Sequence, residues 1–305
     1  MTADADHTQA VQQAVRALSA ARAAWRHAQP SRPAPARFPS RGPLARAVSL
    51  LADALFPARI GRFRGDAADE DAFVADRIGE ALHLIEDEIA QELAYWHDVQ
   101  GLVAGADRPR QIVRLFAGTL SRIRSLLDTD VAAIFRGDPA ARSVDEILIC
   151  YPGATAILHH RIAHELDSLG APIVARIVSE LANERTGIDI HPGATIGPSF
   201  FIDHGTGVVI GETAVIGARV RLYQHVTLGG RGRRANGHEP ERGPHGEREA
   251  RHPIIGDDVL IYAGATILGR VRIGDGTVIG GNVWLLSDVP PRSLVLQPEA
   301  VVAPR

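Results

Sequence analysis

"IIGDDVLIYAGATILGRVRIGDGTVIGG", residues 254–281, carries an aliphatic residue at every sixth position. The full series comprises Ile190, Ile196, Ile202, Val208, Ala214, Val220 and Val226, and then Ile255, Ile261, Ile267, Ile273, Ile279 and Leu285. A six-residue period with small residues two positions earlier and frequent glycine afterwards is typical of a parallel β-helix. Three short strands then form one triangular coil of roughly 18 residues, and the coils stack about 4.8 Å apart around an aliphatic column.

The two series are separated by 255 − 226 = 29 residues, which is not a multiple of six. The chain between them is polar, charged and rich in glycine. The sequence therefore predicts that a loop over residues 229–252 is extruded from the coil.

The residues before this repeat have a helical period. Apolar side chains recur at three- to five-residue intervals over 69–96, and further helical segments are expected at 110–127, 154–170 and 172–187. Ser143 and Glu146 have the spacing of a capping box. We therefore expect an Ala/Arg/Pro-rich arm and linker over 1–67, a helical domain over 68–187, a β-helix over 188–290 and a tail over 291–305.

Composition excludes several functions. The chain of 305 residues contains no lysine, which rules out a Schiff-base lysine or a P-loop lysine. The net charge of -3 creates no field that would attract nucleic acid, and no apolar run reaches the roughly 18 residues of a membrane span. We expect a cytoplasmic protein without nucleic-acid or membrane partners. The single cysteine, Cys150, follows three apolar residues and is predicted to be a buried small hydrophobe.

Several motifs resemble serine O-acetyltransferase. They are "DPAA" (138–141), "DIHPGATIG" (189–197), "DHGTGVVIGETAVIG" (203–217), "VTLGG" (226–230) and "RHPIIGDDVLIYAGATILG" (251–269). The resemblance covers about residues 70–290. It implies an α+β fold, with an N-terminal all-α domain followed by a left-handed parallel β-helix, and it implies a homotrimer or a dimer of trimers. The implied reaction transfers the acetyl group of acetyl-CoA to L-serine, without a metal, as the first step of cysteine synthesis from serine.

The same resemblance assigns the site residues. His204 corresponds to the general base, and Asp189 to the carboxylate that orients it. Asp138 and Asp203 correspond to residues that hold serine, Arg251 to the partner of its carboxylate, and His252 to a further pocket residue. The coenzyme is expected along the coils near Gly229, Gly230, Ala263 and Gly264, where Tyr262 stands in place of the glycine of many relatives.

The chemistry is consistent with these assignments. A serine hydroxyl needs a base within hydrogen-bond reach before it can attack a thioester, and a histidine base needs a partner that fixes its tautomer. Asp189 and His204 are 15 residues apart, three short of a coil, so we expect their backbones on adjacent coils roughly 10 Å apart.

Two alternatives remain open. Hexapeptide-repeat enzymes also acetylate other acceptors, including sugars and antibiotics. A zinc-dependent lyase similar to the β-helical carbonic anhydrases would need three converging histidines, for which His191, His204 and His225 are available.

The C-terminal sequence suggests the absence of one partner. Many serine acetyltransferases insert a terminal isoleucine into O-acetylserine sulfhydrylase, whereas this chain ends in Arg305. Burying an unpaired guanidinium in a pocket for a small amino acid costs several kcal/mol. We therefore expect no complex with the sulfhydrylase through the C-terminus.

Overall fold

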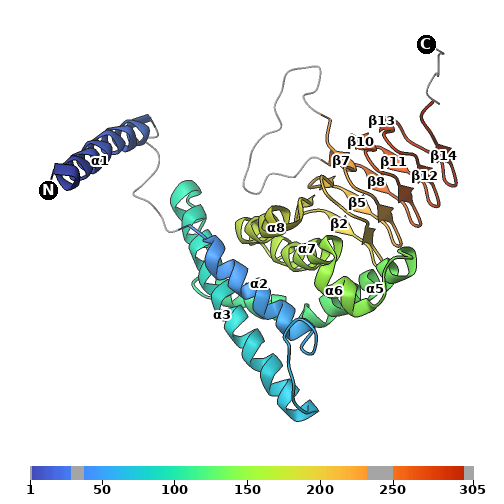
Figure 1. The fold of residues 1–305 in the computed structure, drawn as a ribbon, viewed down its shortest axis with the longest axis horizontal. Helices are drawn as coiled ribbons and strands as arrows, with labels where there is room; N and C mark the ends of the chain where they lie inside the picture. Colours follow the sequence, from blue (N-terminus) through green and yellow to red (C-terminus); the bar gives the residue numbers. More distant parts are fainter. Residues whose placement is uncertain (1, 29–37, 232–249, 299–305) are drawn as a thin grey trace.

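The computed structural model describes residues 2–28, 38–231 and 250–298, and it consists of a helical part followed by a stack of short strands (Figure 1). The helices are α1 (Thr2–Ala28), α2 (Arg41–Leu55), α3 (Ala67–Gln100), α4 (Arg108–Ala117), α5 (Leu120–Gly137), α6 (Val144–Cys150), α7 (Pro152–Ser168) and α8 (Pro172–Thr186). This order confirms the predicted α+β fold class.

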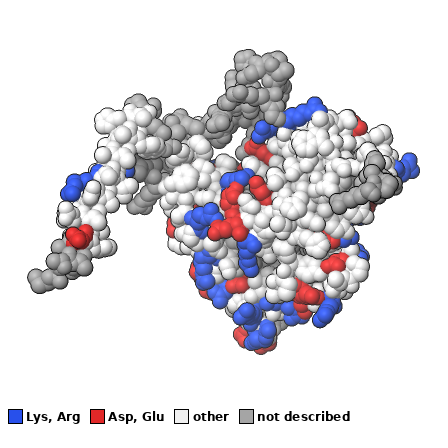
Figure 2. All heavy atoms as spheres, turned by 45° about the horizontal axis from the view of Figure 1, so that its top comes forward, with Lys and Arg blue, Asp and Glu red and all other residues white. Residues whose placement is uncertain are grey.

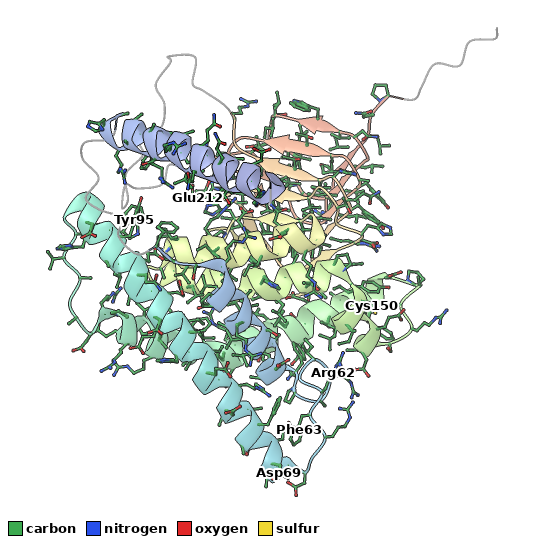
Figure 3. The ribbon with its side chains drawn as sticks, turned by 60° about the vertical axis from the view of Figure 1, so that its left-hand side comes forward. Arg62, Phe63, Asp69, Tyr95, Cys150 and Glu212 are labelled. Atoms are coloured by element: carbon green, nitrogen blue, oxygen red, sulfur yellow. The ribbon has the colours of Figure 1, made fainter. Side chains whose placement is uncertain are left out.

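Local capping fixes where the helices begin and end. The carboxylate of Asp66 accepts hydrogen bonds from the backbone N–H groups of Ala68 and Asp69, both at 3.0 Å, at the α3 terminus where Figure 3 labels Asp69. The Ser143 hydroxyl accepts from the Glu146 backbone at 3.0 Å, as the capping box predicts. Gly187 ends α8 in the left-handed conformation, with φ at 68°.

The structure does not support the predicted boundary at residue 67. Leu44, Leu50 and Leu51 of α2 are fully buried, and α2 packs against α3 and α8. The Ser40 backbone N–H donates to the Glu88 carboxylate at 2.6 Å, which ties the start of α2 to α3. The packed helical region therefore begins at α2. The flanking Ala/Arg/Pro composition had obscured the helical spacing of its leucines.

Cys150 is exposed, so its predicted burial is wrong. It is the last residue of α6, and Figure 3 shows it at the end of that helix. Because this short surface helix buries only Ile147, apolar neighbours in sequence do not place Cys150 in the core.

The strands form three parallel sheets. They are β1 (Asp189–Ile190), β2 (Thr195–Ile196), β3 (Phe201–Ile202), β4 (Val209–Ile210), β5 (Val215–Ile216), β6 (Arg221–Leu222), β7 (Thr227–Gly229), β8 (Ile254–Ile255), β9 (Leu260–Ile261), β10 (Thr266–Leu268), β11 (Arg272–Ile273), β12 (Val278–Ile279), β13 (Trp284–Leu285) and β14 (Leu294–Val295). Sheet A has the order β1-β4-β7-β10-β13, sheet B the order β11-β8-β5-β2, and sheet C the order β14-β12-β9-β6-β3. The second residue of most strands is buried, which forms the predicted aliphatic column.

The first coil is longer than the others. Asp189 pairs with Val209, a step of 209 − 189 = 20 residues, whereas Val209 pairs with Thr227, a step of 227 − 209 = 18. The two additional residues lie in the corner between β3 and β4, which spans 203–208, while the next corner between β6 and β7 spans 223–226. The strict six-residue series of the sequence hides this insertion, because Val208 is also buried.

Two further segments refine the predicted boundaries. Thr227 pairs with Thr266, a step of 39 residues, so the connection from β7 to β8 carries 21 residues beyond an 18-residue coil. Its interior, 232–249, lies outside the described residues. β14 pairs with β12, so the β-helix continues past the predicted end at 290. The expectation about Arg305 also falls outside the described residues.

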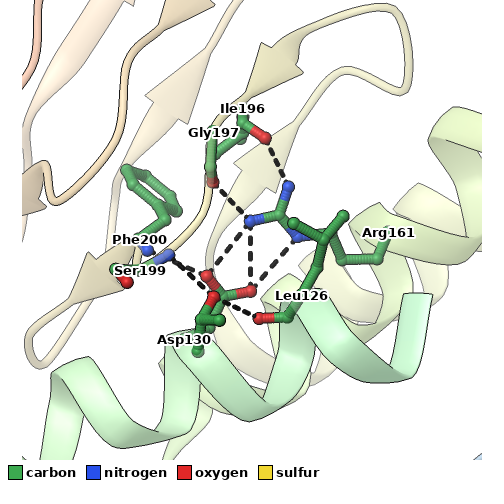
Figure 4. Close-up of polar contacts among 8 residues, drawn as sticks. Leu126, Asp130, Arg161, Ile196, Gly197, Ser199 and Phe200 are labelled. Carbon is green, nitrogen blue, oxygen red and sulfur yellow. Dashed lines mark hydrogen bonds and ion pairs between the residues drawn. The ribbon is translucent and has the colours of Figure 1, made fainter. Parts of the chain in front are cut away.

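A buried ion pair joins the helices to the first coil (Figure 4). Arg161 of α7 and Asp130 of α5 pair at 3.1 Å, with side chains only 5% and 2% exposed. Arg161 also donates to the carbonyls of Ile196 and Gly197, and Asp130 accepts from the Phe200 backbone at 2.8 Å. Burial raises the pKa of Asp130 to about 6, although Arg161 opposes this shift. The pair therefore fixes the end of α5 against the β-helix.

Charges on the surface are mixed in sign. Figure 2 shows acidic and basic side chains interspersed over one face. Within the three described ranges, no helix is both long and apolar enough to cross a bilayer.

Candidate active site

His204 lies in the long corner between β3 and β4. Its φ of 58° is in the left-handed region, which is uncommon for a residue with a side chain. Gly205 and Gly207 beside it also have positive φ, at 91° and 73°. The side chain of His204 is 71% exposed, so a small substrate can reach the imidazole.

Asp138 lies near this corner and directly follows α5. Its carboxylate accepts hydrogen bonds from the Tyr151 hydroxyl at 2.5 Å and from the Ala140 backbone at 2.8 Å. These bonds, that of Tyr151 first, lower the pKa of Asp138, and the same contact raises the pKa of Tyr151 to about 12. Asp138 is therefore held as an anion at the surface.

Asp203 is the carboxylate in contact with His204. Its Oδ1 lies 3.9 Å from His204 Nε2, and its Oδ2 accepts a hydrogen bond from Arg221 at 2.5 Å. Asp203 is only 8% exposed, whereas His204 is open to solvent. The dipeptide thus has one buried anchored member and one free member.

Asp189 does not contact His204 within the described chain. It forms an ion pair with Arg176 of α8 at 3.7 Å. Its backbone N–H donates to the carbonyl of Val208 at 2.9 Å, which places its backbone beside the end of the long corner. Burial, with a contribution from Glu180, raises the pKa of Asp189, and Arg176 opposes the rise.

Arg251 and His252 lie at a different corner, where the extruded loop returns between sheets A and B. The Thr213 backbone N–H donates to His252 Nδ1 at 3.1 Å, so in the neutral ring Nε2 carries the proton. The Thr213 hydroxyl accepts from the Arg251 backbone at 2.9 Å. A Cβ on Gly211 would lie 2.0 Å from the His252 ring, so this glycine makes room for it. His252 is 5% exposed.

The predicted coenzyme residues flank sheet A on both sides. Gly229 ends β7 and Gly230 follows it beside Arg251, whereas Ala263 and Gly264 precede β10 at the corner between sheets C and A. Tyr262 stacks on Tyr223, with ring centroids 5.2 Å apart and planes 10° apart. Tyr262 is 41% exposed, so it presents an aromatic surface beside this path.

One chain therefore brings together only part of the predicted site. Asp138, Asp203 and His204 gather at the corner between sheets C and A, while Arg251 and His252 occupy the corner between sheets A and B. Sequence reasoning missed three contacting residues, Tyr151, Thr213 and Arg221. The available signal for Arg221 was a cation in a strand of an otherwise aliphatic repeat.

The three histidines of the zinc alternative do not gather at one place. His191 follows β1 at the corner between sheets A and B, whereas His204 and His225 lie at the corner between sheets C and A. In the part of the chain that the structure describes, no group of three or more His, Cys, Asp or Glu side chains could hold a metal ion.

Comparison with known proteins identifies the family. Residues 252–287 match the family model described as bacterial transferase hexapeptide (six repeats). The plasmid serine acetyltransferase of Synechococcus elongatus is 48% identical over 265 residues, which cover 85% of this chain and 82% of that protein. This chain belongs to the serine acetyltransferase family. Another family member, from Bacillus subtilis, is 47% identical over 171 residues, 56% of this chain and 73% of that protein.

Solved structures of serine acetyltransferases share the fold. The Entamoeba histolytica isoform 3, in complex with cysteine, has a TM-score of 0.70 and 34% identity, covering 85% of this chain and 84% of that one. The soybean serine acetyltransferase complexed with serine has a TM-score of 0.54 and 32% identity, covering 84% and 99%. The left-handed β-helix with N-terminal helices is thus the family's fold.

The environment of His252 predicts a pH dependence of stability for this family member. Burial, then Arg251 and Arg270, lower the pKa of His252 from 6.5 to about 4. Between these pH values the unfolded chain binds a proton at this residue that the folded chain does not, so stability falls as the pH falls. We expect the thermal midpoint to drop between pH 7 and pH 5 by less in His252→Asn than in the parent. Equal drops in both proteins would contradict this.

Proposed function

We propose that this chain transfers the acetyl group of acetyl-CoA to the hydroxyl of L-serine, which gives O-acetyl-L-serine and CoA. The observation that carries the proposal is the exposed imidazole of His204 beside two carboxylates, Asp138 and Asp203, on a chain of this family. The Synechococcus relative is named a serine acetyltransferase, and the soybean relative was solved with serine.

The proposed reaction needs a base and no covalent enzyme intermediate. His204 takes the proton from the serine hydroxyl as the oxygen attacks the carbonyl carbon of the thioester. The C–S bond then breaks, and the imidazolium returns the proton to the departing CoA sulfur. A carboxylate beside the imidazole stabilises the charged ring between these steps. Asp203 is the carboxylate in contact in one chain, and we propose that Asp189 joins it when substrate orders the corner.

The remaining charges match a zwitterionic amino acid. Asp138 is an anion held by Tyr151 at the surface, and it is suited to the ammonium group of serine. We assign the serine carboxylate to Arg251, and a hydrogen bond from Nε2 of His252 completes the pocket. The pantetheine arm of the coenzyme would then run between Gly229 and Gly230 on one side and Ala263 and Gly264 on the other.

We propose that the active site forms between copies in a homotrimer, or in a dimer of trimers. The support is the separation of His204 and Arg251 at two corners of the same β-helix. In a closed ring, the corner between sheets C and A of one copy can face the corner between sheets A and B of the next. Such an arrangement brings the base and the carboxylate partner together without rebuilding either corner.

Mixing two inactive variants tests this arrangement. If His204→Ala and Arg251→Ala copies are dissociated, mixed and reassembled, about a quarter of the interfaces should carry both native residues. We expect activity to return in the mixture and not in either variant alone. Failure of the mixture, while reassembled native protein regains activity, would place the site within one chain.

An acceptor panel tests the reaction itself. Release of free thiol from acetyl-CoA is measured with L-serine, with ethanolamine, with sugars and without acceptor, before and after treatment with a chelator. We expect release with L-serine, unchanged by the chelator. Release with a sugar in place of serine would support the alternative acceptor, and loss after chelation would favour a metal-dependent reaction.

A further inference from the structure

Arg221 makes an unusual set of contacts in the candidate site. Its two terminal nitrogens donate to different parts of the protein: Nη2 to Asp203 at 2.5 Å, and Nη1 to the carbonyl of Gly137 at 2.8 Å. The guanidinium also lies between two aromatic rings, 4.5 Å from the centroid of Phe201 and 4.7 Å from that of Tyr223. Arg221 is therefore fixed in direction by both its face and its edge.

These contacts reach both acidic residues of the proposed serine pocket. Asp203 is bound directly, and Gly137 is the last residue of α5, immediately before Asp138. A Cβ on Gly137 would lie 2.9 Å from the Phe201 ring and 3.5 Å from Arg221 Nη1, so the close approach of α5 to this arginine needs glycine. One side chain of β6 thus connects the helical part to the long corner.

The arrangement carries a stability cost. Nε of Arg221 is buried and, within the described residues, has no hydrogen-bond acceptor. A buried donor without an acceptor is unfavourable, and an apolar side chain at this strand position would avoid the cost. The retained guanidinium is therefore better explained by its effect on the neighbouring carboxylates than by packing.

We propose that Arg221 is a positioning residue for acetyl transfer: it holds Asp203 beside His204 and sets the position of Asp138 through Gly137. This inference rests on the proposed function. It also gives a simple charge count, because Asp138, Asp203 and Arg221 together carry a charge of about -1, which suits the single ammonium group of serine. Without the arginine the same corner carries about -2.

A double-mutant cycle with Asp203 tests the proposal. In the full-length protein, Arg221→Met should lower kcat by about 10²-fold, because the carboxylate beside the base is no longer held in place. The KM for serine should change much less, since Tyr151 still holds Asp138. In the Asp203→Asn background, Arg221→Met should lower kcat by less than about threefold, because its main target is already gone.

The neighbouring arginine supplies a matched control. Arg219 lies two residues earlier and pairs with Asp257 and Asp258 at the surface, so Arg219→Met should leave both kcat and KM unchanged. Arg221→Lys keeps the charge without the planar fork that reaches two acceptors, and it should lower kcat by about tenfold. It also keeps the test valid if Arg221→Met does not fold.

The outcomes separate the two proposals. Turnover of Arg221→Met and Arg221→Lys within about twofold of an active parent would overturn the role of Arg221 and leave the proposed function intact. Equal losses in the native and Asp203→Asn backgrounds would also overturn it, since the arginine would then act independently of Asp203. A parent protein that releases no thiol with serine would refute the proposed function instead.

Discussion

Replacement of His204 with alanine is expected to lower serine-dependent acetyl transfer by about 10²- to 10⁴-fold, which is the usual contribution of a general base. The side chain is 71% exposed, so its removal should leave the fold intact. The measurement is the rate of thiol release from acetyl-CoA at saturating serine. CoA binding, followed by calorimetry, should be retained, because the base acts on the acceptor.

His225→Ala is a suitable control for this variant. His225 occupies the corresponding corner one coil further along, with φ also at 58°, and it has no assigned role in the reaction. We expect its turnover to stay near that of the parent. Unchanged turnover in a folded His204→Ala protein would refute the assignment of the base. A comparison of Asp189→Asn with Asp203→Asn would then show which carboxylate supports the imidazole, since loss of that one should lower kcat more.

Removal of Arg161 should cause the largest loss of stability. Arg161→Met leaves the buried Asp130 without its cation and the carbonyls of Ile196 and Gly197 without their donor. Breaking a buried ion pair on one side typically costs about 3–5 kcal/mol. We expect a large drop in the thermal midpoint at fixed protein concentration, together with a loss of activity as the end of α5 loosens from the β-helix.

A surface pair provides the comparison. Arg46 and Glu80 pair at 3.1 Å with side chains 54% and 44% exposed, and such pairs contribute about 0–1 kcal/mol. Arg46→Gln should therefore shift the midpoint little. If Arg161→Met unfolds at the same temperature as Arg46→Gln, the buried pair does not anchor the helices in the way described.

Much of the fold was predictable because the β-helix writes its period into the sequence. Each inward strand position must be aliphatic, so residues such as Ile255, Ile261 and Ile267 reveal the repeat directly. α2 was missed because its leucines are embedded in an Ala/Arg/Pro-rich stretch. The longer first coil was missed because Val208 kept the six-residue series intact while the strand positions moved by two residues.

The candidate site was predictable only as a set of residues. The motifs around Asp203, His204 and Arg251 can be read locally, but their spatial grouping depends on corner geometry, which a repeat pattern does not specify. Arg221 was not predictable as a partner of Asp203, because the two residues are 18 positions apart and meet only through the pairing of β3 with β6. The role of Asp189 remains a prediction.

The six-residue corner at 203–208 has a wider consequence for how such a protein can change. The strand pairings on either side of it are those of a regular coil, so reactivity occupies an insertion that the scaffold does not need. Mutations can therefore lengthen, shorten or reload this segment while the aliphatic column continues to specify the architecture. A β-helix of this type can acquire or lose an acceptor in evolution without passing through an unfolded ancestor.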